Sequence, residues 1–411
     1  MGSLHVLGIL NFLPVEGEGN RKEGVYPIFV KAHAMRDVEF DMIALKEGKT
    51  KRQVDFCSGL GVTFIEPYRG FLLRVIVSYM CVVFCTVPNL SLFLVFSWIC
   101  FIIRNRKSLA AIDDYIEERG KPDIISALTS IVTAGRAAYL VSKKYNIPFV
   151  ARENRTLYSR GGVKGHYKNT IHAPAVSASA VIPVSPQLGS AMREVFSVDE
   201  NRVRPIQNAV ADEFFIKPSG GSEWIKVFSD NRFIFAGWTN WRDIKRVDIA
   251  LKAFAVLHRD EPGTCLVIAG PLPDWTEKMS EELGISDSVK FAGSLDRKGV
   301  HELAHSCDCC IVPSDHDPGN NSVLEAMAAG KPVIVTKCGG SESRITDPSL
   351  GIVVEKGDIE GFASAMKEVY ENRISYDAEH ISGVCRSLYS EKKLSENLMA
   401  VYREVLENKS S

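Results

Sequence analysis

The chain has 411 residues, 45% hydrophobic and 24% charged, which predicts an ordinary globular protein of two domains. Its 49 Lys and Arg nearly balance its 50 Asp and Glu, so the formal net charge is -1. Nucleic-acid-binding proteins carry a basic excess, and this balance therefore argues against nucleic acid as a partner.

Apolar runs alternate with longer amphipathic stretches along the whole chain, beginning with the segment MGSLHVLGILNFLP. That opening lacks the basic start of a secretory signal, so we interpret it as a first strand in a cytoplasmic protein. The alternation predicts parallel sheets covered by helices. The expected strands are His5–Leu10, Asp41–Ala44, Val62–Ile65, Asp123–Ser126, Phe149–Ala151, Val181–Val184, Phe233–Ala236, Cys265–Ala269, Val289–Phe291, Cys309–Pro313, Pro332–Val335 and Gly351–Val354.

A glycine-containing loop, VEGEGNRKEGV, follows the first expected strand. Gly17 and Gly19 give it a partial G-x-G-x-x-G appearance, but the third glycine comes late, at Gly24. The loop is therefore either the edge of a binding site or a plain connection.

No charged residue occurs from Val75 to Ile103, and basic residues flank the segment at Arg74 and at Arg104, Arg106 and Lys107. The segment is long enough to span a bilayer, but Pro88-Asn89 divides it into two pieces that are each too short. We expect a shallow, interfacial pair of helices at the membrane surface in preference to a pair buried in the protein.

The turn-rich stretch KPSGGSEWIKVFSDN separates two complete alternating sets, which predicts a first domain of residues 1–216 and a second of 217–390. Residues 391–411 contain an amphipathic helix, Glu391–Asn408.

The ten cysteines lie in apolar runs and expected strands without a regular framework, which predicts buried, reduced thiols. Cys307, Cys309 and Cys310 could suggest zinc. Alternation along a strand would point Cys309 and Cys310 to opposite faces, and no second Cys or His pair follows at ligand spacing. We therefore expect a core strand and no metal site.

The stretch SDHDPGNNSVLEAMAAGKPVIV places two acids, Asp317 and Glu325, around a glycine loop. A strand, the loop Gly319-Asn320-Asn321 and a helix over Ser322–Ala329 would form an anion site, because free N–H groups and the helix dipole point outward at the loop. The Glu325 carboxylate can accept bonds from a vicinal diol such as a ribose.

The stretch DPGNNSVLEAMAAGKPVIVTKCGGSESRI resembles the E-x7-E signature of the retaining family 4 glycosyltransferases. FIFAGWTNWRDIKRVDIALKAFAVL is similar to the glycine-plus-lysine donor motif of that family, and RPIQNAVADEFF to its asparagine stretch between domains, with Asn208 at the matching place. The likeness covers the second half in the right order and the first half only in outline.

This resemblance implies the α/β GT-B fold: two doubly wound Rossmann-like domains facing a cleft, with the terminal helix crossing back to the first domain. It implies a nucleotide-sugar donor held mainly by the second domain, with no metal or other cofactor. Glu325 would bind the ribose, and Asp317 the donor sugar. Lys245 would neutralise the departing diphosphate. The donor-binding set is Gly237, Gly319, Asn320, Asn321, Ser322, Val323, Leu324 and Glu325.

Four positions depart from the family pattern. The first acid of the signature is Asp317 instead of Glu, and Ala209 stands where a glycine follows Asn208 in the family. The arginine that usually follows the donor-motif glycine is Trp238, and Arg242 is the candidate to supply its charge.

In the first domain, Asn154 stands where many members carry a histidine, and Asn cannot act as a general base. Retaining members are thought to use the donor phosphate for the acceptor proton, so transfer need not be lost. Its neighbours Glu153 and Arg155 either line the acceptor side or form surface salt bridges.

Two other functions remain open: a sugar-nucleotide epimerase on the same fold, and a non-catalytic relative that acts as a scaffold. The uncharged segment favours a transferase whose acceptor is a saccharide, lipid-linked, at the cytoplasmic face of a membrane. The sugar, the nucleotide base and the oligomeric state do not follow from the sequence.

Overall fold

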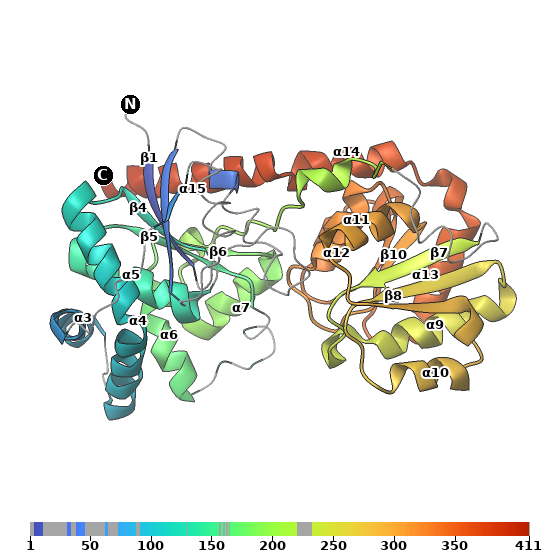
Figure 1. Ribbon diagram of the computed structural model, residues 1–411, viewed down its shortest axis with the longest axis horizontal. Coiled ribbons are helices and arrows are strands. Elements are labelled where there is room, and N and C mark those ends of the chain that lie inside the picture. The colour runs from blue at the N-terminus through green and yellow to red at the C-terminus, as the bar shows by residue number, and fades with distance from the viewer. Residues whose placement is uncertain are drawn as a thin grey trace. The chain divides into compact units, whose positions relative to one another are not determined.

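The computed structural model describes residues 4–10, 31–33, 38–45, 62–64, 73–87, 91–128, 130–155, 158, 161, 163, 165–219 and 232–410. These residues form two compact units, the first reaching to Gln207 and including Leu394–Ser411, the second running from Asn208 to Lys393. Each unit contains its own parallel sheet (Figure 1). The turn-rich stretch in which we expected the boundary lies largely outside the described residues. The segment just before it belongs to the second unit, where the Val210 N–H donates to the Tyr389 carbonyl at 2.9 Å.

The first sheet has six strands in the order β3-β2-β1-β4-β5-β6, all parallel. They are β1 Leu4–Leu10, β2 Val38–Ala44, β3 Thr63–Phe64, β4 Ile124–Ala127, β5 Phe149–Glu153 and β6 Ala180–Pro183. Four of them (β1, β2, β4 and β5) are apolar and largely buried, as expected of parallel strands with both faces covered.

The second sheet also has six parallel strands, in the order β12-β11-β10-β7-β8-β9. They are β7 Phe233–Trp238, β8 Thr264–Ala269, β9 Val289–Gly293, β10 Cys309–Val312, β11 Val333–Thr336 and β12 Gly351–Val354. Both sheets therefore have the doubly wound strand order. In such sheets ligands bind at the carboxyl ends of the two strands where the order reverses, which in the second sheet are β7 and β10.

Helices cover both faces of the second sheet. In Figure 1, α9 and α10 lie on one side of the strands and α11, α12 and α14 on the other. The helices of this unit are α9 Val247–Asp260, α10 Thr276–Glu282, α11 Arg297–Ser306, α12 Asn321–Ala328, α13 Ile359–Glu371 and α14 Ala378–Tyr389, with short 3-10 turns η3 Asp212–Phe215, η4 Asp243–Lys245, η5 Ser286–Ser288, η6 Ser341–Arg344, η7 Pro348–Leu350 and η8 Arg373–Ser375.

The first unit has α3 Leu73–Thr86, α4 Leu92–Arg119, the π-helix η1 Ile131–Gly135, α5 Arg136–Tyr145, α6 Gly165–Ser177, α7 Pro186–Phe196 and the 3-10 turn η2 Glu200–Arg202. The terminal helix α15 Glu391–Ser410 contributes most of its length to this unit. Its buried Tyr402 hydroxyl lies 2.7 Å from Ser126 Oγ of β4 and 2.8 Å from His33 Nε2, so polar contacts as well as apolar packing join this helix to the first sheet.

Every strand expected from the sequence corresponds to a strand of the structure, with ends that differ by a few residues. The largest difference is at β2, which begins at Val38 instead of Asp41. The extra residues pair in register with the beginning of β1, a neighbour that the alternation pattern alone does not identify.

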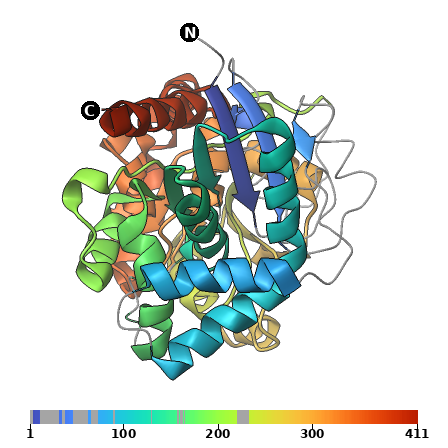
Figure 2. The same cartoon turned by 90° about the vertical axis from the view of Figure 1, so that its left-hand side faces the viewer.

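The uncharged segment 75–103 forms two helices, α3 and α4, that pack side by side in the first unit (Figure 2). One face of this pair enters the core through residues such as Tyr79, Val83 and Trp98. The other face is exposed, with Phe84 at 60%, Leu92 at 91% and Phe96 at 64% of full accessibility. The fully buried alternative is therefore wrong. Among the described residues, no helix combines the length and the apolar character that crossing a bilayer requires.

The cysteine prediction is correct in the second unit and wrong on these helices. Cys265, Cys307, Cys309, Cys310, Cys338 and Cys385 are buried free thiols, whereas Cys81, Cys85 and Cys100 are exposed. The cause is the exposed face of α3 and α4, since an apolar run predicts burial only where something covers both its faces. Burial raises the pKa of Cys307 to about 12, which keeps this thiol protonated and unreactive.

Candidate functional site

The carboxyl ends of β7 and β10 carry the polar groups that the sequence singled out. We refer to Trp238, Lys245, Asp317 and the segment Asn320–Glu325 as the switch-point site. β10 delivers the loop that contains Asp317, and this loop leads into α12. Lys245 ends the short turn η4, which follows β7. All of these residues belong to the second unit.

Asn320 caps the beginning of α12, a position at which Asn is favoured. Its side-chain oxygen accepts the Ser322 N–H at 3.0 Å, and the buried Arg344 donates to its carbonyl. The cap occupies the N–H that we expected to meet a diphosphate at Ser322, so that bond must be exchanged if an anion binds there. The cap also fixes the direction of the helix axis, which sets the direction of its dipole.

Lys245 and Asp317 form a buried ion pair. The ammonium of Lys245 donates to Asp317 Oδ2, and the two side chains are only 9% and 11% exposed. Asp317 Oδ1 accepts the Gly319 N–H at 3.2 Å, so the same carboxylate also holds the glycine loop. The sequence placed these two groups at one site but did not predict that they would bind each other.

Asp315-His316-Asp317 has the D-x-D spelling of a metal-binding motif, but Asp315 has a different partner from Asp317. Both Asp315 oxygens accept bonds from Arg246, at 3.1 and 3.2 Å, and Arg246 also binds Asp248. Each acid of this pair therefore faces its own cation. Arg246 adopts a left-handed backbone conformation, φ 53°, and sequence reasoning did not identify it.

Glu325 is half-buried and lies one turn along α12 from the cap. Its Oε2 accepts the indole N–H of Trp238 at 2.6 Å. Burial raises the pKa of the Glu325 carboxyl above its ordinary value, whereas the Trp238 bond and the charge of Arg297 lower it. Trp238, noted only as a departure from a family pattern, is thus a direct partner of the expected ribose-binding acid.

Close backbone packing surrounds the site. A Cβ at Gly237 would lie 3.0 Å from the Trp241 ring, and one at Gly340 would lie 2.3 Å from the Pro318 carbonyl oxygen. A small pocket of about 10 Å³ remains between Trp238, Ser314, Asn320 and Ser322. That volume is near the lower limit for one water molecule, so a larger ligand would enter this pocket only if the loop moved.

Asn208 also holds the glycine loop. The sequence identified this residue only by its position in the asparagine stretch of the family motif. Its amide nitrogen donates to the Gly319 carbonyl at 3.2 Å and to Asn321 Oδ1 at 3.1 Å. Arg344 was not singled out by sequence, and its position in the turn after the glycine pair is a weak signal. Burial lowers the pKa of this arginine.

The charge role expected of Arg242 stays a prediction. Its side chain is exposed, without a hydrogen bond or ion pair to any described residue. Its carbonyl accepts the Lys245 N–H at 2.7 Å, so its observed contribution is to the turn that presents Lys245.

Glu153 is neither a surface residue nor available to an acceptor, which corrects both alternatives from the sequence. It is fully buried at the end of β5. Its oxygens accept the Ile131 N–H at 3.1 Å, the Tyr158 hydroxyl at 2.7 Å, and the N–H groups of Asn154 and Arg155, each at 3.0 Å. The carboxylate therefore holds the start of η1 and the end of β5 together. Burial raises its pKa.

The other acceptor-side candidates differ in what they can contact. Asn154 is half-buried, and its side-chain oxygen has no hydrogen-bond partner within the described part of the chain, while Arg155 is exposed. Gly17 and Gly19 lie outside the described residues.

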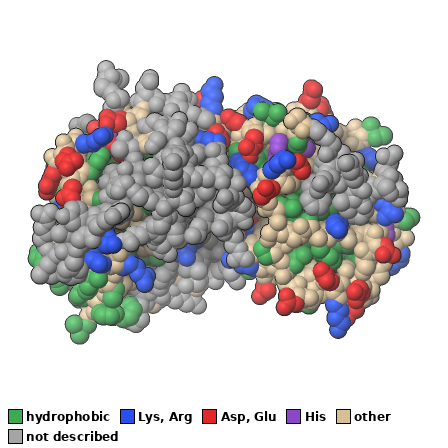
Figure 3. Space-filling view, viewed as in Figure 1, with side chains coloured by type: hydrophobic (Ala, Val, Ile, Leu, Met, Phe, Trp, Pro, Cys, Tyr) green, Lys and Arg blue, Asp and Glu red, His purple; other side chains and the backbone are tan. Residues whose placement is uncertain are grey.

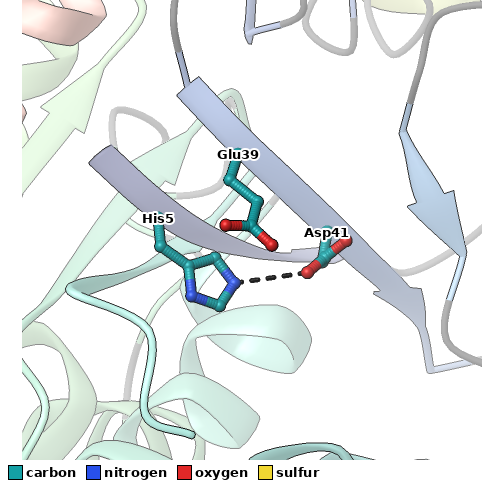
Figure 4. Close-up of side chains that lie close together, drawn as sticks. All are labelled: His5, Glu39 and Asp41. Atoms are coloured by element: carbon teal, nitrogen blue, oxygen red, sulfur yellow. Dashed lines mark hydrogen bonds and ion pairs between the residues drawn. The ribbon is translucent and has the colours of Figure 1, made fainter. Parts of the chain in front are cut away.

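His5, Glu39 and Asp41 form the single group of three potential metal ligands in the described part of the chain (Figure 4). His5 and Glu39 are register partners on β1 and β2, at the amino-terminal edge of the sheet. Asp41 already accepts bonds from His5 Nε2 at 3.2 Å and from Tyr115, and Arg119 lies 3.8 Å away. We interpret the group as a hydrogen-bonded ion pair, because its buried carboxylate is committed to protein donors.

The two doubly wound units define the GT-B fold class. The chain aligns over 98% of its length with the whole of Anabaena HepE, whose structure is in complex with UDP, at a TM-score of 0.70 and 16% identity. At that identity the likeness establishes the fold alone.

Residues 225–382 match the family model described as glycosyl transferases group 1. Mycobacterium tuberculosis glycogen synthase is 24% identical over 267 residues, 61% of each chain. The lipopolysaccharide core biosynthesis glycosyltransferase LpsE of Rhizobium meliloti is 34% identical over 96 residues, 23% of this chain and 28% of that one. Residues 225–382 are therefore similar to the group 1 glycosyl transferases, in agreement with the predicted class of enzyme. The match covers 61% of the glycogen synthase and 28% of LpsE. Because the chain spans only part of each relative, the activity of the whole chain is a proposal.

Proposed function

We propose that the chain is a retaining glycosyltransferase of the family 4 type, which moves a sugar from a nucleotide-diphosphate sugar to a saccharide acceptor without a metal. The observation that carries this proposal is the buried Lys245–Asp317 pair beside a capped helix beginning at the carboxyl ends of β7 and β10. Cation, carboxylate and helix N-terminus are the groups that a sugar diphosphate needs.

The chemistry follows from where charge develops. When the bond between the anomeric carbon and the phosphate oxygen breaks, negative charge grows on the departing diphosphate. The Lys245 ammonium and the N-terminus of α12 would stabilise that charge, a part that a divalent cation plays in other enzymes. Asp317 would accept hydroxyl groups of the donor sugar, which requires its bond to Lys245 to loosen as the phosphate takes over the ammonium.

Retention of the anomeric configuration suits the absence of a general base at Asn154. In the retaining route the departing phosphate oxygen takes the proton of the acceptor hydroxyl, which attacks from the same face as the phosphate leaves. Glu153 does not compete for that proton, since its oxygens are fully engaged by donors. Asn154 can orient the acceptor through its amide.

The first test is calorimetric binding of UDP, GDP, ADP and their common sugar conjugates, in EDTA. UDP is the first choice because HepE, which has the same fold, is known in complex with it. Micromolar binding of one nucleotide, lost in Glu325→Ala and kept in Glu360→Ala, is expected. Glu360 is a suitable control because it is exposed in the first turn of α13. A folded wild-type protein that binds none of them would refute the proposal and leave the scaffold alternative.

Transfer is tested next, with the donor sugar identified by binding and a panel of saccharides. Product with the same anomeric configuration as the donor, formed in excess EDTA, is the expected result by NMR. Inverted product or a strict requirement for added metal contradicts the mechanism. Interconversion of the donor sugar without any acceptor would instead favour the epimerase.

We further propose that the acceptor is lipid-linked and that α3 and α4 contact the cytoplasmic face of a membrane. The exposed apolar side chains Val77, Phe84, Leu92, Phe93 and Phe96 occupy one side of this helix pair, followed by the basic residues Arg104, Arg106 and Lys107. Figure 3 has hydrophobic side chains and basic ones together at that end of the first unit. Apolar insertion next to basic residues is the pattern of interfacial attachment to anionic lipid.

Membrane contact is measured by sedimentation with vesicles of neutral lipid, with and without anionic lipid. Phe84→Ser with Phe96→Ser should release the protein from anionic vesicles. Ile374→Ser, which removes an even more exposed apolar side chain (94%) from the second unit, should not. Equal sedimentation of wild type and both variants would refute the contact.

A further inference from the structure

Trp238 contacts α12 at two points, Ser322 in its first turn and Glu325 one turn along from the cap. The indole N–H donates to Glu325 Oε2 at 2.6 Å, and the Trp238 carbonyl accepts the Ser322 hydroxyl. The residue ends β7 and is only 5% exposed. Because β7 is an inner strand of the sheet, paired with β8 and β10, the indole is held by a rigid element.

No cation of the described chain pairs directly with the Glu325 carboxylate. The basic group whose charge acts on it is Arg297 of α11, and Arg297 donates to Glu213 of η3. Those two opposite charges act on Glu325 in opposite directions, and the buried Cys310 of β10 is another titratable neighbour. Among the residues that the structure describes, the Trp238 N–H is therefore the one side-chain donor that supports the ionised carboxylate.

One bond to one oxygen has a geometric consequence. A carboxylate has two oxygens and about four lone-pair positions, of which Trp238 uses one. The bond fixes the plane of the group while Oε1 and the second position on Oε2 remain for a ligand. Two adjacent hydroxyl groups can then bind in the bidentate manner that carboxylates favour.

We propose that Trp238 is the positioning residue for nucleoside recognition, orienting the Glu325 carboxylate so that it selects a donor with a vicinal ribose diol. This inference rests on the proposed function, since it concerns the donor of that reaction. The family resemblance would place an arginine at position 238, where its charge would face the diphosphate. Trp238 would instead support Glu325, the acid expected to bind the ribose.

If Trp238 positions Glu325, replacing Trp238 should reduce the preference for a ribose over a deoxyribose nucleotide. With UDP and 2′-deoxy-UDP as the probes (or the corresponding pair for the base that binds), wild type should prefer the ribose form. Trp238→Phe should weaken binding of the ribose form roughly 10- to 100-fold, as expected for loss of a hydrogen bond to a charged group, and the deoxy form much less. A residue with only a packing role would weaken both forms equally.

The chain offers a matched control in Trp241. Its indole is also buried beside the pocket, but its N–H donates to the backbone carbonyl of Ala269 at 2.9 Å. Trp241→Phe thus removes a similar bond from the same region, and it should leave the ratio of the two affinities unchanged. Trp238→His, which keeps a ring N–H, should recover part of the ratio.

The pH dependence provides a second readout. The diol binds the ionised carboxylate, so affinity falls as pH drops through the pKa of Glu325, which burial already raises. Because Trp238 favours the ionised form, Trp238→Phe should move this loss of affinity to higher pH. The shift should be absent in Glu325→Gln, which has no carboxylate to titrate.

The outcomes separate this inference from the proposed function. If wild type binds no nucleoside diphosphate, the proposed function itself fails. If wild type binds but Trp238→Phe keeps both the ribose preference and the pH profile, the role of Trp238 is refuted and the transferase is not. If Trp238→Phe does not fold, Glu325→Gln and Trp238→His decide. An undiminished ribose preference in Glu325→Gln overturns the inference. Loss of the preference in Glu325→Gln, with part of it kept in Trp238→His, supports the inference.

Discussion

Asp317 has a proposed role in the reaction, and its buried pair with Lys245 should also stabilise the second unit against unfolding. Asp317→Asn keeps the shape of the side chain but leaves the Lys245 ammonium, 9% exposed, without its carboxylate. Removing one partner of a buried pair costs about 3–5 kcal/mol, much of it the desolvation of the remaining charge. In a unit of this size, each kcal/mol of destabilisation lowers the melting temperature by about 2–4 °C. The melting temperature of Asp317→Asn should therefore fall by roughly 6–20 °C.

Thermal unfolding followed by circular dichroism, with urea unfolding as a second measure, tests this value. Asp315→Asn is the matched control, since Asp315 is half-buried and its partner Arg246 keeps Asp248, so its cost should stay below about 1 kcal/mol. The double variant Lys245→Met with Asp317→Leu should regain much of the loss, because no unpaired charge remains.

At equal ligand concentration, a nucleoside diphosphate should stabilise Asp317→Asn more than wild type, because it binds more tightly when its phosphate gives Lys245 a new partner. If Asp317→Asn melts within about 2 °C of the Asp315→Asn control, the pair is not the buried, mutually dependent unit that the structure indicates, and the reasoning fails.

Three further outcomes follow from single contacts. Glu153→Ala should destabilise the first unit by roughly 2–5 kcal/mol in urea unfolding, because it leaves several buried donors unsatisfied; a change below about 0.5 kcal/mol would contradict its place at the centre of that network. Gly340→Ala should weaken nucleotide binding at least about tenfold by calorimetry, since the added Cβ would overlap the Pro318 carbonyl and displace the loop; unchanged affinity would mean that the loop position is irrelevant. The bond to Asp41 raises the pKa of His5. The stability that this bond contributes is therefore present below about pH 6.5 and is lost as pH rises through the raised pKa of His5. His5→Gln should remove that part of the pH dependence of unfolding, and an unaltered profile would refute the assignment.

How much of the site could be predicted depended on whether the signal was local. The acids and the glycine loop of the stretch Asp317–Glu325 lie within one strand–loop–helix unit, so spacing alone predicted that they would gather at a helix beginning. Asn320 as a cap belongs to the same local logic, because Asn before an apolar helical run accepts the first free N–H groups.

The main correction concerns a contact between segments apart in the chain. The sequence left Glu153 either on the acceptor side or in a surface salt bridge, whereas the structure buries it at the end of β5, where it accepts the N–H of Ile131 from η1. Neighbouring strands and turns supply this environment, and local spacing carries no signal for it.

The sequence by itself determined the strands and the parallel sheets through periodicity, and the acids and glycine loop of the switch-point site through a motif a few residues long. The doubly wound class and the role of Lys245 followed from the family resemblance. Only the tertiary structure decided which charges face each other: that Lys245 binds Asp317, that Arg246 binds Asp315, and that Trp238 supports Glu325. These pairs join residues that are dozens of positions apart in the chain. Their geometry depends on strand order and loop direction, which become fixed only when the sheet assembles and buries both faces.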